Sequence, residues 1–121
     1  MILHEAYSYD KDSDSLFVAI PVSYKYKGVI VIEEGVILLE FDTNNTPRAI
    51  EILGASVVLN TESKYLLKEN IKKIELAFKI TNNEISVKLE LVSKQKIRLV
   101  KTIKNHEKIP ENTQKFLISK E

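Results

Sequence analysis

The sequence contains no cysteine and no tryptophan, and only three of its 121 residues are glycine. Without cysteine the chain has no disulfide, no thiolate zinc site and no cysteine nucleophile. The isolated Gly28, Gly35 and Gly54 cannot form the glycine-rich loop that cradles phosphate groups. The lack of cysteine also fits a reducing compartment, so we expect a cytoplasmic protein.

Long hydrophobic runs are also missing. The longest, Val29–Ile32 and Val36–Leu39, are far too short to cross a bilayer, and residues 1–5 have no basic region followed by an apolar stretch. We therefore expect no membrane segment and no signal peptide. With 44% hydrophobic residues, a chain of this length can bury one ordinary core, which predicts a single domain over residues 1–121.

Charge is unevenly distributed along the chain. Residues 1–57 carry four Lys/Arg against nine Asp/Glu, a net charge of −5, whereas residues 58–121 carry fourteen against eight, or +6. Basic and acidic residues are interleaved in the second half, so we interpret the two halves as parts of one globule that attract each other. The mixed signs, and tyrosines that lie mostly in the acidic half, argue against nucleic acid as a partner.

The N-terminal half predicts short antiparallel strands. A turn at residues 10–14 precedes an apolar strand over 16–20, which Pro21 ends because it cannot donate to a sheet ladder. Residues 29–32 form another strand, and residues 36–53 form a hairpin around a turn at 43–46. A short helix is expected over residues 59–72, with Asn60 or Thr61 as its N-cap.

The C-terminal half carries the clearest pattern. Apolar residues alternate from Ile74 to Ile80 and again from Ile85 to Leu91, and a two-residue turn at Asn82-Asn83 places Ile80 opposite Ile85. A third strand over 97–103 keeps its apolar residues inward only if the loop around Lys94 has an odd length, with Lys101 as the one polar misfit.

Together these patterns predict an α+β fold of mostly antiparallel sheet. It comprises an N-terminal β-hairpin module (1–58), one short helix (59–72), a C-terminal three-stranded meander (73–104) and a tail (105–121).

The first acidic turn resembles the opening of a calcium loop but lacks two of its positions. Where that loop needs a glycine and a bidentate glutamate, the sequence has Ser15 and Pro21. We interpret Asp10 and Asp14 as acceptors of backbone N–H groups in a turn. His4 and His106 lie far apart in the sequence without a second ligand nearby, so no metal is assigned.

The hairpin carries further acidic residues. Glu40 and Glu51 are expected to face one another, with Asp42 nearby, and paired carboxylates push their pKa values apart, as general acid–base catalysis requires. The alternative, which we favour, is an acidic solvent-facing surface. The candidate acidic site therefore comprises Asp10, Asp14, Glu40, Asp42 and Glu51, and no catalytic or cofactor-binding residue is assigned.

Three stretches carry a family resemblance. They are Tyr9–Leu16 with its acidic turn, Gly35–Asp42 with its acidic end, and Ala49–Ser56 with its isoleucine-glutamate-isoleucine strand. The N-terminal module resembles the family catalogued as domain of unknown function 2283, although Asn45 and Ala49 stand where that family usually has glycine. The resemblance implies a fold and no activity. Because members sometimes sit beside small toxin-like genes, it also implies an antitoxin-like role as a hypothesis.

Two function classes follow from the sequence. The favoured one is a non-enzymatic interaction or structural module that acts through self-association and a protein partner. The second is a small carboxylate- or metal-dependent enzyme that uses Glu40 and Glu51. Val29–Ile32 and Val36–Leu39 are apolar on both faces, so a second cover is needed, and we expect a homodimer to supply it. The competing cover is the tail, with its apolar residues 116–118.

Overall fold

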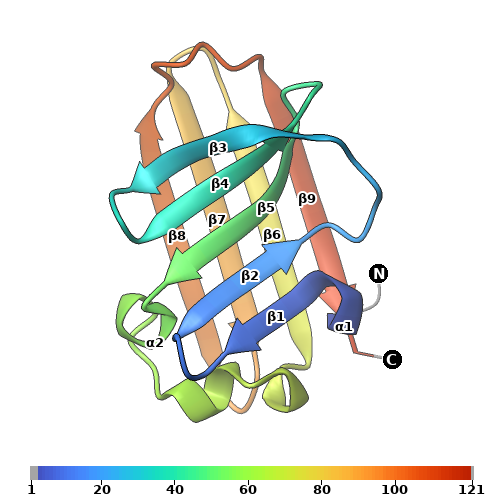
Figure 1. Cartoon of the computed structure of the whole chain (residues 1–121), viewed down its shortest axis with the longest axis vertical. Helices are drawn as coiled ribbons and strands as arrows, with labels where there is room; N and C mark the ends of the chain where they lie inside the picture. Colours follow the sequence, from blue (N-terminus) through green and yellow to red (C-terminus); the bar gives the residue numbers. More distant parts are fainter. Residues whose placement is uncertain (1–2, 121) are drawn as a thin grey trace.

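Two antiparallel sheets, one from each half of the chain, face each other in the computed structural model (Figure 1). The structure describes residues 3–120, except the side chain of His4. The N-terminal sheet has the order β1-β2-β5-β4-β3 and the C-terminal sheet the order β8-β7-β6-β9. The strands are β1 (Tyr7–Asp10), β2 (Ser15–Ala19), β3 (Tyr26–Glu33), β4 (Ile37–Asp42), β5 (Pro47–Leu53), β6 (Lys73–Ile80), β7 (Glu84–Val92), β8 (Lys96–Lys104) and β9 (Asn112–Ser119).

The predicted N-terminal hairpin is confirmed. Strands β4 and β5 pair antiparallel, with Ile37 opposite Ile52 and Leu39 opposite Ile50. These side chains are fully buried and point toward the other sheet. The β-branched and leucine side chains at every second position give each strand one apolar face, which fixes the register.

The predicted register of the C-terminal meander is also confirmed. Ile80 lies opposite Ile85, and Leu91 lies opposite Ile97 across a connection of three residues, Ser93–Gln95. Lys101 falls on the core-facing side opposite Val87, as its place in the alternation requires. It is half-buried, and its Nζ reaches Glu33 Oε1 of the other sheet at 3.6 Å.

The predicted tail is wrong, because residues 112–119 form a fourth strand of this sheet. Strand β9 pairs antiparallel with β6 and places Ile118 opposite Ile74 and Phe116 opposite Leu76. The three consecutive apolar residues 116–118 hide the alternation in the sequence, since Leu117 points outward while its neighbours point inward. The tail therefore extends the C-terminal sheet and does not cover the outer face of the N-terminal sheet (Figure 1).

The predicted helix over 59–72 is also wrong. Four-residue helices occur earlier, α1 (Leu3–Ala6) and α2 (Ala55–Val58), and two 3-10 turns follow, η1 (Ser63–Leu66) and η2 (Lys68–Asn70). Asn60 ends α2 with a left-handed φ of 51° instead of beginning a helix. The connection is anchored by the buried Leu59, Leu66 and Ile71. The spacing of seven between the first two would suit an α-helix, but the step of five to Ile71 would not.

The core lies between the two sheets and separates their charges. The inward faces are apolar throughout most of both sheets, so the acidic residues of the first half and the basic residues of the second half point mainly to opposite outer faces. Among the described residues, the Lys101–Glu33 ion pair alone joins charged side chains of the two sheets. Attraction between the two halves is therefore a minor contribution beside burial of the core.

The new strand gives a direct test of the fold. Ile118 is completely buried, whereas the adjacent Leu117 is 61% exposed on the other face. We expect Ile118→Ala to lower the free energy of unfolding by about 2–4 kcal/mol. The matched control, Leu117→Ala, should change it by less than about 0.5 kcal/mol. Urea unfolding followed by circular dichroism measures both, and equal losses would show that β9 does not pack as described.

Candidate functional site

Asp14 joins the first turn to the start of α2 through hydrogen bonds, an arrangement that we call the Asp14 clasp. Its carboxylate accepts hydrogen bonds from Tyr9 Oη at 2.5 Å and from Ser56 N and Oγ at 3.0 and 2.7 Å. Its own carbonyl oxygen accepts from Ala55 N, and its φ of 54° lies in the left-handed region. Burial by itself raises the pKa of Asp14, but the bonds from Tyr9 and Ser56 outweigh it and hold that pKa below its ordinary value.

Asp10 closes the same turn from its other end. The side chain is exposed, and its Oδ1 accepts hydrogen bonds from the backbone N–H groups of Asp12 at 3.0 Å and Ser13 at 3.4 Å. Asp10 thus accepts backbone N–H bonds of its own turn, as the sequence predicted. The prediction is wrong for Asp14, because the backbone N–H that bonds its carboxylate belongs to Ser56, outside the turn.

Asp42 has a comparable structural role at the end of β4. It is almost completely buried, and its carboxylate accepts bonds from Asn44 N at 2.8 Å, Thr46 N at 3.0 Å and Arg48 Nε at 2.8 Å. Burial raises the pKa of Asp42, and these three donors together hold it below its ordinary value. The carboxylate therefore stabilises the β4–β5 turn.

Glu40 and Glu51 do not face one another across the hairpin. The register places Glu40 opposite Ala49 and Glu51 opposite Leu38, so the two glutamates lie diagonally on the outer face. Glu40 Oε1 accepts a hydrogen bond from Tyr24 Oη at 2.9 Å. Burial, together with that bond to Glu40, raises the pKa of Tyr24 to about 12.

The five sequence-predicted carboxylates therefore occupy three places. Asp10 and Asp14 share the first turn, Glu40 and Asp42 lie near Tyr24 and Arg48, and Glu51 is in neither group. Sequence reasoning missed Ser56, Tyr24 and Arg48 as their partners. Only Arg48 left a signal, as the one basic residue of an otherwise acidic hairpin.

Among the residues that the structure describes, no three His, Asp or Glu side chains lie close enough together to hold a metal ion. No helix within that part of the chain is long and apolar enough to span a bilayer.

The outer face of the N-terminal sheet carries aliphatic and aromatic side chains. We call Phe17, Val29, Val31 and Leu38 the outer apolar surface. Val29 and Val31 are 46% and 45% exposed, and Leu38 lies directly opposite Val31. On the neighbouring strands, Glu51 lies opposite Leu38, and Phe17 lies opposite Glu51. Both Phe17 and Leu38 are half-buried. The prediction that strands 29–32 and 36–39 are apolar on both faces is therefore confirmed.

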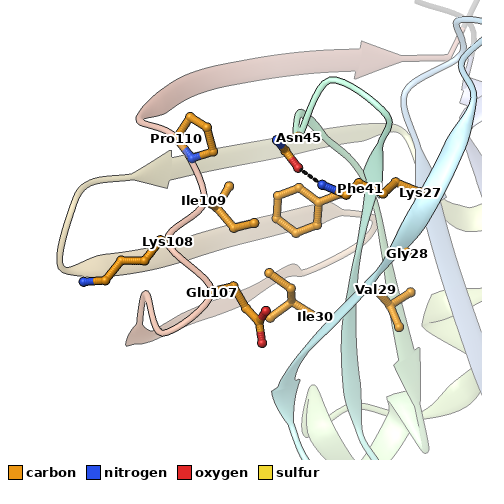
Figure 2. A pocket seen from close by; sticks show the side chains of 10 residues that line it. All are labelled: Lys27, Gly28, Val29, Ile30, Phe41, Asn45, Glu107, Lys108, Ile109 and Pro110. Atoms are coloured by element: carbon orange, nitrogen blue, oxygen red, sulfur yellow. Dashed lines mark hydrogen bonds between the residues drawn. The ribbon is translucent and has the colours of Figure 1, made fainter.

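A second surface feature lies at the free side of β3. An open cavity of about 340 Å³, the edge groove, is shown in Figure 2. It is lined by Lys27, Gly28, Val29, Ile30, Phe41, Asn45, Glu107, Lys108, Ile109 and Pro110. Buried Asn105 holds the far wall, because its Nδ2 donates to Ile109 O and its Oδ1 accepts from Ile109 N, both at 2.9 Å.

Comparisons with known proteins agree with the resemblance seen in the sequence. The pattern of the family described as "Protein of unknown function (DUF2283)" matches residues 6–56. An uncharacterized protein of Methanocaldococcus jannaschii is 36% identical over 83 residues, which cover 69% of this chain and 68% of that protein. No solved structure matches the chain.

The Asp14 clasp predicts a pH-dependent stability. Because its pKa is lowered on folding, Asp14 contributes stability above the unfolded pKa and loses it as the pH falls through the folded pKa. We expect Asp14→Asn to lower the free energy of unfolding at pH 7 by about 1–3 kcal/mol. The difference from the wild type should shrink below about pH 4.

Asp12→Asn is the matched control, since Asp12 is exposed in the same turn. It should change the stability by less than about 0.5 kcal/mol at either pH. Urea titrations at pH 7 and pH 3 measure all three proteins. A loss in Asp14→Asn that stays constant with pH would contradict the clasp.

Proposed function

The chain belongs to the family of proteins of unknown function DUF2283, and on that premise we propose that it is a non-enzymatic interaction module. In this proposal it self-associates as a homodimer through the outer apolar surface and binds a protein partner in the cytoplasm. An antitoxin-like role, with a small toxin as the partner, is one form of this function.

The observation that carries the proposal is the outer apolar surface. Two of the seven exposed large hydrophobic side chains among the described residues, Val29 and Val31, lie on this surface, with the half-buried Leu38 directly opposite Val31. Single exposed aliphatic residues are ordinary, but a contiguous group on a regular sheet face is typical of an interface. A second copy supplies a matching sheet face, and sheets stack about 10 Å apart with interdigitating side chains.

The carboxylates support the non-enzymatic interpretation. Asp14 and Asp42 accept several internal hydrogen bonds each, and these bonds hold both groups ionised. Glu40 and Glu51 lie on an open sheet face with different neighbours. Paired-carboxylate chemistry needs two groups that converge on one substrate atom. The arrangement instead suits a surface that recognises a partner.

A single charge on the outer apolar surface tests self-association. We expect Val31→Lys to remain folded, because the side chain is already half exposed, and to shift the protein toward the monomer mass of 13.9 kDa. Light scattering behind a sizing column measures this across a concentration series. The control, Val100→Lys, changes a 54% exposed valine on the other sheet and should leave the mass unchanged. If the wild type were still a monomer at high micromolar concentration, the proposed homodimer would be wrong.

Glu51 gives a second test of the same interface. It lies between Leu38 and Phe17 near the middle of the surface, so a twofold axis there brings two carboxylates together. We expect Glu51→Gln to strengthen self-association by about threefold to tenfold, because repulsion between like charges is removed. Sedimentation equilibrium at pH 7 gives the dissociation constants. Weaker association in this variant would indicate that Glu51 meets a cation of another surface.

A further inference from the structure

Strand β3 is an unpaired edge of the N-terminal sheet. Within residues 3–120 it pairs with β4 alone, so the backbone N–H and C=O groups along its other side have no strand partner in that part of the chain. Four consecutive residues, 27–30, line the edge groove. Side chains of successive strand residues point to opposite faces, so a cavity that contacts all four borders the backbone edge itself. The groove therefore offers the hydrogen-bonding side of a strand.

The groove has charged ends and an apolar middle. At one end, Lys27 donates a hydrogen bond to Asn45 Oδ1, and at the other, Figure 2 shows the Glu107 carboxylate beside Ile30. Phe41 and Ile109 lie between them. Lys108 also lines the groove, but Figure 2 shows its side chain pointing away from Phe41 and Ile30. The charged groups that border the apolar middle thus change from positive at Lys27 to negative at Glu107 along the direction in which β3 runs.

The groove also has spare room and a fixed wall. A Cβ atom placed on Gly28 would meet no atom within 4 Å, so the space beside this residue is open. The opposite wall is held by the Asn105 hydrogen bonds to residue 109 and to Thr81 O. A preformed groove loses little conformational entropy when a ligand enters.

From these observations we propose that the edge groove binds an extended peptide segment of the protein partner, which adds to β3 as a sixth strand. The inference rests on the proposed function, because it names the docking site and the chemistry of the partner. The peptide runs antiparallel to β3, as every pairing in this sheet does. A basic side chain lies by Glu107, an apolar one over Phe41 and Ile109, and an acidic one by Lys27.

A second copy of β3 fits this groove less well than a single peptide. The connection between β8 and β9 forms the wall beside residues 27–30 and lies beyond β3 in Figure 1. A twofold β3–β3 pairing would bring two such connections into the same space. One extended segment meets only one of them, so the geometry favours the peptide.

The experiment uses acetylated and amidated five-residue peptides. Lys-Thr-Val-Thr-Glu places lysine, valine and glutamate on the groove side in the antiparallel direction, and Glu-Thr-Val-Thr-Lys reverses the charges. A third peptide has the first sequence with alternate backbone amides methylated. Amide chemical shifts of the full-length, isotope-labelled protein report the site. We expect shifts confined to residues 26–31 and 105–110, and binding about fivefold to tenfold weaker for the reversed peptide.

Gly28→Val is the decisive variant, since the free space around Gly28 lets the chain accept a larger side chain that fills the groove. We expect it to weaken binding at least about tenfold while unfolding like the wild type. Ala77→Val, on the outer face of the other sheet, is the matched control and should bind normally. Equal binding by Gly28→Val, by the methylated peptide or by the reversed peptide would overturn the proposal.

Light scattering separates this site from the self-association surface. Val31→Lys should bind the peptide normally, because residue 31 does not line the groove. If Gly28→Val became monomeric, a second copy would occupy the groove and the peptide proposal would be wrong. If the wild type were monomeric but bound the peptide as expected, the proposal of self-association would be wrong and the proposal of strand addition to β3 would be supported.

Discussion

Burial of the two inward sheet faces against each other is the constraint on which the rest of this structure depends. Each half of the chain supplies one sheet, and each sheet has one continuous apolar face, from Leu16 to Ile52 in the first and from Ile74 to Ile118 in the second. An antiparallel sheet with one apolar face needs a cover, and here each half covers the other. The family pattern matches residues 6–56, which form the N-terminal sheet alone. A chain of only these residues would expose the face that β6 to β9 cover.

The same constraint decides where the charges lie. Because the inward positions are apolar, charged residues alternate to the outside, and the acidic and basic halves become opposite surfaces of one molecule. The exception is Lys101, which occupies an inward position near the edge of its sheet. A lysine can do this because its long stem packs along apolar neighbours while its ammonium group reaches Glu33 at the margin. The two halves do differ in net charge, but attraction between those charges contributes little to holding the two sheets together.

The sequence predicted the parts of the fold that local alternation and turn length determine. The β6–β7 pairing, from Ile74 opposite Leu91 to Ile80 opposite Ile85, followed from a two-residue turn. The odd loop before β8 followed from keeping the apolar residues of 97–103 inward, which leaves Lys101 as the one polar misfit. Strand β9 could not be predicted in this way. It lies next to β6 in the sheet, but β7 and β8 come between them in the sequence, so no turn sets its register. The connection after β5 failed for a similar reason: Leu59, Leu66 and Ile71 are placed by the core and not by a helical period.

The candidate site shows the same division. The role of Asp10 was predictable because an acidic turn bonds its own backbone, but the backbone N–H that bonds the Asp14 carboxylate belongs to Ser56, which lies 42 residues away. The pairing of Glu40 with Glu51 was an error of two positions in register. Counting back from the four-residue turn at 43–46 places Glu40 opposite Ala49, as in the structure, so turn length determines this pair and the expected one did not follow it. The irregularity between Glu40 and Phe41 shifts the register by one residue on the turn side only, and alternation alone does not reveal such a bulge.

The edges of the two sheets explain why β3 is the place to seek a partner. Strand β1 is short, and both β1 and the other edge strand β9 contact α1. Strand β8 carries Lys96, Arg98 and Lys104, whose charges discourage pairing with another chain. Strand β3 has eight residues with the apolar segment 29–32 at its centre. Register irregularities at both of its ends leave residues 28–31 as the regular, pairing-competent segment. This is also the segment that borders the edge groove and presents Val29 and Val31 on the outer face. A strand that is unprotected along its backbone and exposed on its outer face is costly to keep in water, and both costs are removed when a partner covers it.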